Sequence, residues 1–358
     1  MILVLVHELG HFLTSIFFKV KVEEFGIGFP PAFYKRNING TKFSLNILPL
    51  GGFVKLYGED GSNQSDPDSF ASKKLWQKII ILVAGVFNNL LLGYGILAVL
   101  LFIGLPLIGD FSDIYAHLDN RAIIKREEIN ITMVKKDSPA QIAEIKTNDK
   151  ILNFGTSAED LAKEKPLANF EYFVQNNKGR EIFLKIKSSG AEKVISVIPR
   201  IDHPENDGPI GVGLMPAVIY SYPFGQNFVE AFNMVTKTFN MFFKTIGNIF
   251  GSIFNLKSET HDVAGPVGIA VMTNSISKLG PLYLVAFLAS FSINLAIVNL
   301  LPIPGLDGGR ILLLLLEKVI GKKIGQKVES YSIGVGLAFL ILVVIFVTIK
   351  DVLFYFIY

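Results

Sequence analysis

The feature that most constrains the fold is a series of long apolar runs separated by polar stretches. The clearest run covers residues 79–108 and follows three lysines, and two further runs cover residues 283–302 and 333–347. A helix of about 20 apolar residues crosses the hydrocarbon core of a bilayer. Irregular chain does not occur in contact with lipid there, because its backbone N–H and C=O groups would have no hydrogen-bond partners. Because half of all residues are hydrophobic, the sequence predicts a membrane protein with several spanning helices.

A fourth apolar run, residues 1–18, encloses the polar motif His7-Glu8-Leu9-Gly10-His11. Two histidines at i and i+4 lie on one face of a helix, at the spacing that binds one Zn²⁺. Glu8 is then placed to take a proton from a zinc-activated water. The alternative is a chance motif in a soluble helix. The membrane setting argues against it, because ionisable groups are costly in a spanning helix and therefore indicate function.

The length of this first run is marginal. Residues 1–18 would form a helix of about 27 Å, which is barely a span. The run is either a short helix or the remainder of a longer one whose start is missing. It has neither the basic leader nor the small-residue cleavage site of a signal peptide.

A catalytic zinc site needs a third protein ligand and leaves one position open. The chain has no cysteine, and its other histidines stand among polar residues: His117, His203 and His261. The remaining candidate is Asp307, which follows the run 283–302 in a segment with two prolines and three glycines within residues 302–309. Such a segment ends a helix, and broken helices at membrane depth line enclosed or wet cavities. The alternative is an aspartate that caps a loop.

Between the first two runs, Asn39-Gly40 is a strong turn signal. It predicts a β-hairpin over about residues 32–55, after an irregular stretch rich in glycine and proline at 25–31. The simpler interpretation is a surface hairpin. The alternative is that residues 41–48 form an edge strand that accepts an extended peptide by strand addition.

The region 110–221 is predicted to be a separate extracytoplasmic domain of mixed α and β structure. Alternating segments predict strands at 131–134, 151–154, 181–187 and 194–199, and a helix is predicted over 167–175. A short helix is predicted to begin at Ser138, with Pro139 in its first turn. A turn is predicted at 265–269.

The predicted organisation has four parts. Residues 1–109 form an N-terminal membrane part, the domain 110–221 follows, and residues 282–358 form a C-terminal membrane part. Between them, residues 222–281 are predicted to be interfacial, because phenylalanines alternate with polar residues over 224–256. The alternative for that stretch is a further span.

Lysine and arginine are concentrated in residues 19–78 and 310–328. These two segments lie on one side of the membrane if there are four spans, and the positive-inside rule makes that side cytoplasmic. The site would then lie near the cytoplasmic side. The net charge is only +3, which offers no basic footprint for nucleic acid.

Two distant motifs together resemble one family. The motif at residues 7–11 and the sequence N-L-L-P-I-P-G-L-D-G-G at 299–309 are similar to those of the site-2 protease family of intramembrane zinc metalloproteases. Residues 136–140 and 147–152 resemble the core of bacterial PDZ domains, with Asn148 where glycine is usual, so the chain is similar to the regulator of sigma-E protease type. Gly85-x-x-x-Asn89 resembles the second-span motif of the family.

The resemblance implies a polytopic α-helical membrane protein of about four transmembrane helices, with a membrane-associated β-hairpin and one inserted α+β PDZ-like domain. It implies Zn²⁺ held by His7, His11 and Asp307, with Glu8 as general base. Asn89 and Asn299 match residues that handle substrate or stabilise the oxyanion. For Asn89, helix packing is the alternative.

The implied activity is a zinc metalloendopeptidase of the bacterial cytoplasmic membrane. It would cut transmembrane segments of single-pass proteins in regulated intramembrane proteolysis, for example an anti-sigma factor or remnant signal peptides. The PDZ-like domain would bind a peptide or restrict access by size. The rival hypotheses are an inactive scaffold that binds peptides through this domain, and a zinc transporter or sensor. The few histidines offer no second ligand set for a transporter.

Overall fold

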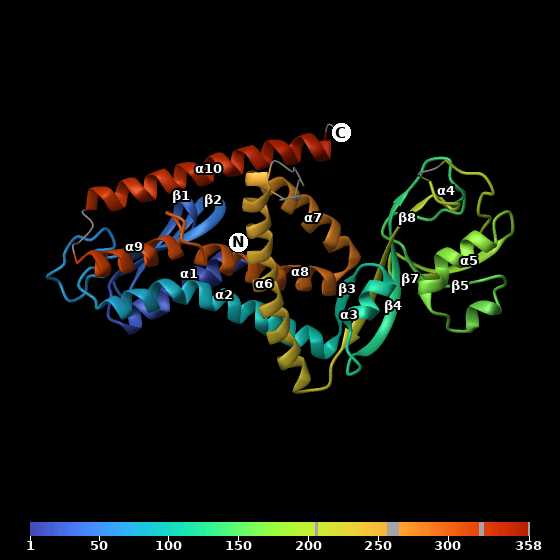
Figure 1. The fold of residues 1–358 in the computed structure, drawn as a ribbon, viewed down its shortest axis with the longest axis horizontal. Coiled ribbons are helices and arrows are strands. Elements are labelled where there is room, and N and C mark those ends of the chain that lie inside the picture. Colours follow the sequence, from blue (N-terminus) through green and yellow to red (C-terminus); the bar gives the residue numbers. More distant parts are fainter. Residues whose placement is uncertain (205–206, 256–264, 322–325, 357–358) are drawn as a thin grey trace. The chain divides into compact units, whose positions relative to one another are not determined.

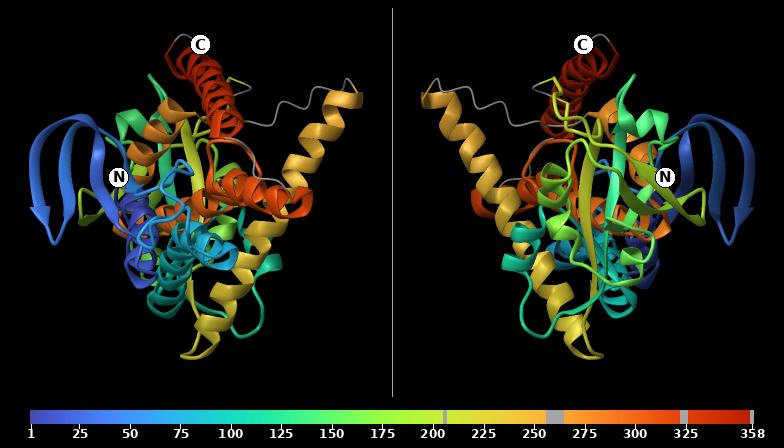
Figure 2. Two further views of the ribbon diagram at one scale, coloured as in Figure 1. Left: turned by 90° about the vertical axis from the view of Figure 1, so that its left-hand side faces the viewer. Right: turned by 90° about the vertical axis from the view of Figure 1, so that its right-hand side faces the viewer.

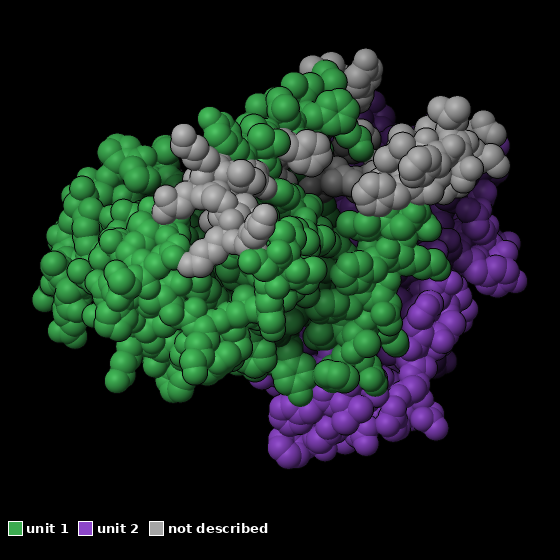
Figure 3. Space-filling view, turned by 60° about the vertical axis from the view of Figure 1, so that its left-hand side comes forward, with its two compact units in different colours: residues 1–96, 232–272, 288–358 green, residues 97–231, 273–287 purple. Residues whose placement is uncertain are grey.

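The computed structural model describes residues 1–204, 207–255, 265–321 and 326–356. The chain divides into two compact units, which Figure 3 shows in green and purple. Unit 1 contains residues 1–96, 232–272 and 288–358, and unit 2 contains residues 97–231 and 273–287. Several long helices contribute residues to both units.

Five helices that unit 1 contains wholly or in larger part carry the apolar runs and Asp307, and Figure 1 labels them. They are α1 (Ile2–Phe17), α2 (Leu75–Ile103), α8 (Pro281–Leu300), α9 (Asp307–Ile320) and α10 (Gln326–Phe356). Three stretches of the described chain are long and apolar enough to cross a membrane: Leu75–Ile103, Pro281–Leu300 and Gly334–Leu353. Helix α1 has 16 residues and is shorter than a span. Three predicted spans therefore have matching helices, and four spans remain a prediction.

The predicted span 79–108 is wrong at its C-terminal end. Helix α2 stops at Ile103, and Gly104 follows with a φ of 142°, a conformation that glycine adopts readily. Residues Leu105–Ile108 then form strand β3, which pairs with β8 (Val212–Ser221). The apolar residues 104–108 are equally consistent with a buried strand and with a helix. They form a strand because β8, a distant segment of the chain, pairs with them.

Helices α1 and α2 approach each other at backbone distance. A Cβ added at Gly10 would lie 2.3 Å from the carbonyl oxygen of Ala84. Beside this contact, Asn88 Nδ2 donates a hydrogen bond of 3.2 Å to the carbonyl of Val6. Small residues at the crossing and an interhelical amide bond are the usual means of joining helices in lipid.

Strands β1 (Val22–Ile38) and β2 (Thr41–Leu56) form a curved sheet, seen in blue in Figure 2. The predicted turn is confirmed: Asn39 and Gly40 have φ of 50° and 84° and join Ile38 directly to its partner Thr41. The predicted start at residue 32 is wrong, because the stretch rich in glycine and proline also belongs to β1.

Both strands bend, so parts of each pair twice. Phe25 stands opposite both Phe43 and Val54, and Phe43 also stands opposite Arg36. Residues 42–45 are therefore paired on both sides, and the interpretation of 41–48 as an edge strand is wrong for them. The register places residues 52–56 at one edge of the described sheet and residues 34–38 at the other.

Unit 2 is built on a six-stranded antiparallel sheet in the order β3-β8-β4-β5-β6-β7. The remaining strands are β4 (Ile123–Val134), β5 (Lys150–Gly155), β6 (Ile182–Ser188) and β7 (Ala191–Val197). The helices of this domain are α3 (Phe111–His117), α4 (Pro139–Ile142) and α5 (Phe170–Asn176), with short 3₁₀ turns at Asp160–Ala162 and Leu167–Asn169. The four predicted strands and the predicted helix near 167–175 are present. Strands β3 and β8 were not predicted.

Two local predictions in this domain have clear physical reasons. Ser138 caps α4, since its Oγ accepts a hydrogen bond of 3.2 Å from Gln141 N, and Pro139 occupies the first turn. Asn148 has a φ of 73°. Asparagine tolerates this left-handed conformation better than most residues, so it can stand where glycine is usual.

Helix α6 (Gln226–Asn255) covers the predicted interfacial stretch and is not among the candidate spans of the described chain. Its position at the membrane surface stays a prediction. The predicted turn at 265–269 is wrong beyond its first residue, because Pro266 begins helix α7 (Pro266–Leu279). His261 lies outside the described residues.

The contact between α1 and α2 generates a stability prediction. Gly10→Ala should lower stability by about 1–3 kcal/mol, because the added methyl group forces the two backbones apart. The thermal midpoint of the purified protein in detergent should fall accordingly. Gly95→Ala is the matched control in α2, since a Cβ there meets nothing within 4 Å. Equal midpoints for the two variants would contradict the contact.

Candidate metal centre

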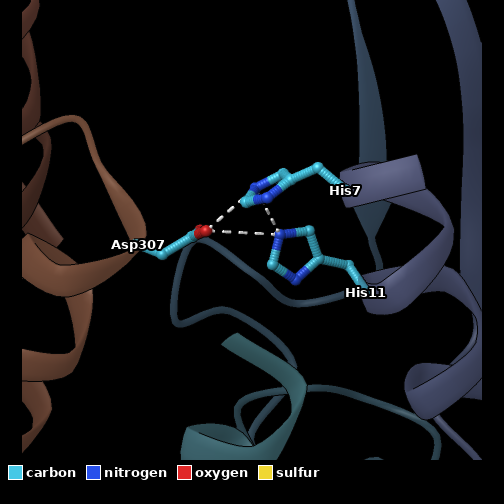
Figure 4. Close-up of side chains that lie close together, drawn as sticks. All are labelled: His7, His11 and Asp307. Atoms are coloured by element: carbon cyan, nitrogen blue, oxygen red, sulfur yellow. Dashed lines mark hydrogen bonds and ion pairs between the residues drawn. The ribbon is translucent and has the colours of Figure 1, made fainter. Parts of the chain in front are cut away.

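Three side chains from two helices converge in unit 1. His7 and His11 project from α1, and Asp307 is the first residue of α9 (Figure 4). His7 Nε2 lies 3.0 Å and His11 Nε2 lies 3.4 Å from Asp307 Oδ2. The two Nε2 atoms are 3.2 Å apart. The ligands of a tetrahedral zinc ion at 2.0–2.1 Å would be about 3.4 Å apart, so these residues fit a single zinc ion.

The surroundings of the histidines favour metal binding. Both are buried, and His11 Nδ1 lies 2.8 Å from the carbonyl oxygen of Ile81. A carbonyl can only accept, so Nδ1 carries the hydrogen and Nε2 presents its lone pair to the centre. Apart from its contacts with the two Nε2 atoms, the buried Asp307 Oδ2 has no hydrogen-bond partner in the described part of the chain. Such an atom is costly, and a cation would satisfy it.

Glycine at position 85 makes room for the two imidazoles. A Cβ added there would lie 2.5 Å from His11 Nε2 and 2.8 Å from His7 Cε1. Helix α2 therefore passes directly over the histidine rings, and any side chain at this position would displace them. This contact accounts for the glycine of the Gly85-x-x-x-Asn89 motif.

Two further glycines position Asp307. A Cβ at Gly308 would lie 2.2 Å from the carbonyl oxygen of Leu300, and one at Gly309 would lie 2.1 Å from that of Ile303. The segment after α8 thus folds tightly against the first turn of α9. The sequence predicted Asp307 within a loop, whereas the structure makes it the first residue of a helix, where an acidic side chain is favourable.

A cavity of about 370 Å³ adjoins the three side chains. Its polar lining consists of His7, Glu8, His11, Glu59, Asn299, Asp307 and Arg310. Glu8 stands beside the β1–β2 sheet, since a Cβ at Gly52 would lie 3.5 Å from Glu8 Cγ. The neighbouring edge residues Phe53, Val54 and Leu56 also line the cavity. Its size is within the range of ligand pockets.

The two asparagines are placed differently. Asn299 lines the cavity, whereas Asn89 is fully buried and is not one of the lining residues. Both polar side-chain atoms of Asn89 lack a hydrogen-bond partner among the described residues. Its backbone oxygen accepts a hydrogen bond of 2.8 Å from Ser292 Oγ of α8. The sequence offered both asparagines as candidates for substrate or oxyanion contact, and of the two only Asn299 lines the cavity.

Sequence reasoning missed Glu59 and Arg310. Arg310 follows Asp307 by three residues, so a helix beginning at Asp307 would have placed the two near each other. Glu59 lies in a polar stretch after β2, and no local sequence pattern indicates that this stretch lines the metal cavity. Of the other histidines, His117 is exposed and His203 is partly exposed, and neither belongs to the described metal-ligand group.

Comparisons with known proteins agree with this geometry. The family model described as peptidase family M50 matches residues 1–343. A protein named "Putative zinc metalloprotease" from Clostridium acetobutylicum is 32% identical over 99% of this chain and 95% of its own length. One of the same name from Clostridium perfringens is 33% identical, covering 98% and 96%. The chloroplastic membrane metalloprotease ARASP of Arabidopsis thaliana is 30% identical, covering 98% and 76%.

The family model spans most of the chain, and the two clostridial relatives match over nearly their whole lengths. Such coverage excludes a match confined to one short motif. The apolar helices that enclose the three converging side chains fall within the matched residues. The chain belongs to peptidase family M50, the site-2 protease family.

Proposed function

We propose that this zinc-dependent membrane metalloprotease is an intramembrane endopeptidase that cuts the transmembrane segments of single-pass proteins. The observation that carries the proposal is the convergence of His7, His11 and Asp307 on a cavity that also holds Glu8. Helix α1, which supplies both histidines and Glu8, is apolar, so the cavity offers a polar site next to a helix suited to lipid. Family membership and the names of the relatives support zinc as the cofactor.

His7, His11 and Asp307 are the proposed zinc ligands, because their three donor atoms form a triangle of the size that zinc requires. The chemistry that zinc supplies in such sites is polarisation of a carbonyl and activation of water. Glu8 accepts the proton of the attacking water and returns it to the leaving nitrogen. Asn299 donates its amide hydrogen to the developing oxyanion. Burial of Asn89 away from the cavity lining favours its packing role.

A helical substrate must unwind before its peptide bond becomes accessible, because its amides are hydrogen-bonded within the helix. The edge of the β1–β2 sheet next to Glu8 offers a place for the unwound segment. Residues 52–56 are paired on one side only, and Phe53, Val54 and Leu56 among them line the cavity. Strand addition along this edge would hold an extended segment beside the ligands.

The domain in unit 2 supports a separate binding role. A groove of about 320 Å³ lies between Phe170 and Val174 of α5 and the segment Ile210–Val212 that leads into β8. Such a groove suits an extended peptide, which would add to a strand edge. The same groove supports the alternative of an inactive scaffold, but Glu8 and all three proposed ligands are present.

The proposed setting is the bacterial cytoplasmic membrane. Lysines and arginines in residues 19–78 and 310–328 favour a site near the cytoplasmic side and an extracytoplasmic PDZ-like domain. Helix α6 would lie at the interface. The proposed substrates are single-pass proteins such as an anti-sigma factor or remnant signal peptides.

Glu8→Gln should retain zinc and lose cleavage by about 10²–10⁴-fold, because the amide cannot take up the proton of water. The measurement is cleavage of a tagged single-pass substrate in detergent, together with the zinc content of each preparation. Cleavage at the wild-type rate would exclude Glu8 as the base and favour the scaffold hypothesis.

Removal of zinc should abolish cleavage, and added zinc should restore it.

Asp307→Ala should reduce zinc affinity by at least about tenfold, because one of three protein ligands is lost. Zinc content after dialysis against a chelator measures this, with Asp202→Ala, an exposed position, as the control. Retention of zinc by both variants would exclude Asp307 as a ligand.

Proline substitutions test the edge strand. In an edge strand, the N–H groups of alternate residues point away from the sheet, where a substrate strand could accept hydrogen bonds from them. Of the two neighbouring variants Phe53→Pro and Val54→Pro, one therefore removes such a donor. The loss of one hydrogen bond to substrate should lower kcat/KM by about tenfold with zinc content unchanged. Asn37→Pro, at the opposite edge, is the matched control. Wild-type cleavage by all three variants would remove the edge-strand proposal.

A further inference from the structure

Arg310 and Glu59 connect two distant segments of unit 1 at the wall of the metal cavity. The Arg310 guanidinium donates through Nη1 to Glu59 Oε1 and, at 3.4 Å, through Nη2 to the backbone oxygen of Glu59. The second carboxylate oxygen of Glu59 accepts a hydrogen bond of 3.1 Å from Leu56 N. Both oxygens of this carboxylate are therefore in use, and both residues line the cavity that holds Asp307.

The segment that carries Glu59 is itself tied to the end of α1. Tyr57 N donates to the carbonyl of Lys21 at 2.9 Å, and Phe70 N donates to the carbonyl of Tyr57 at 2.8 Å. Lys21 stands four residues after Phe17, the last residue of α1. The backbone around Glu59 is thus held by the same part of the chain that presents the two histidines.

Helix α9 packs on an apolar cluster close to this point. The cluster consists of Val20, Val22, Leu56, Phe70, Ile81 and Leu82, and Ile311 and Leu314 of α9 pack against it. Apolar contact is non-directional, so it restrains the rotation of the helix and its position along its axis less sharply than a directional polar bond does. A guanidinium that bonds a carboxylate and a carbonyl has a fixed geometry and supplies that direction.

We propose that the Glu59–Arg310 pair is a positioning latch that sets the Asp307 carboxylate against His7 and His11. Arg310 is one helical turn from Asp307 on the same side of α9, so fixing its guanidinium fixes the first turn of the helix. Glu59 and Arg310 are positioning residues, because they act through α9. The inference rests on the proposed role of Asp307 as a zinc ligand.

The test is the zinc affinity of the full-length protein in detergent, measured by competition with a chelator. Glu59→Gln and Arg310→Gln should each weaken zinc binding by about tenfold, which is the effect of removing a group that orients a ligand. The zinc affinity of Arg310→Lys should lie between that of these two variants and that of the wild type, because lysine keeps the charge but lacks the planar guanidinium. The exchange variant E59R/R310E should bind zinc more tightly than either single variant.

Glu23→Gln is the matched control. Glu23 pairs with Lys55 at 2.8 Å on the same sheet, and Glu23 does not line the metal cavity. Exposed pairs contribute little, so its zinc affinity should equal that of the wild type. Thermal midpoints of the zinc-free proteins separate general stability from positioning, because a merely structural pair would lower the midpoint and leave the affinity of the folded protein unchanged.

Zinc affinities of Glu59→Gln and Arg310→Gln within twofold of the wild type would overturn the latch. Asp307→Ala, measured in parallel, shows which inference has failed. If Asp307→Ala loses zinc while the two latch variants keep it, only the latch is wrong. If Asp307→Ala also keeps zinc, the ligand assignment is wrong and the latch falls with it.

Discussion

The centre of unit 1 depends on the cost of placing ionisable side chains among apolar helices. Two histidines and an aspartate are buried or nearly so, and each would be unfavourable alone. Their nitrogen and oxygen atoms instead lie within 3.4 Å of one another. The helices around them are therefore arranged so that these groups meet, with a geometry that one cation could satisfy.

Close approach of backbones is the means by which the groups meet. Helix α1 contacts α2 at Gly10, and α2 passes over the imidazoles at Gly85. The segment after α8 folds onto α9 at Gly308 and Gly309. At each position a methyl group would overlap atoms that are part of the site or its support. Packing in lipid has little hydrophobic driving force, so small residues and polar contacts carry it.

The sheet formed by β1 and β2 belongs to this site as much as the helices do. Its edge lies beside Glu8, and the segment that follows it supplies Glu59 to Arg310 of α9. In the proposed function, the same short region would hold an extended substrate and would contact the helix that carries Asp307. Substrate binding and metal geometry would be coupled through it.

The sequence by itself determined which residues carry the proposed chemistry, namely a pair of histidines at zinc-ligand spacing with its glutamate and a distant aspartate at a helix break. It also determined the turn at Asn39-Gly40. These depend on residue type and local spacing, which periodicity and backbone preference make readable. Only the tertiary structure decided that residues 105–108 form a strand, that 52–56 are at an edge while 42–45 are paired on both sides, and that Asn299 rather than Asn89 lies at the cavity. Each of these depends on a partner far away in the chain, which local patterns do not specify.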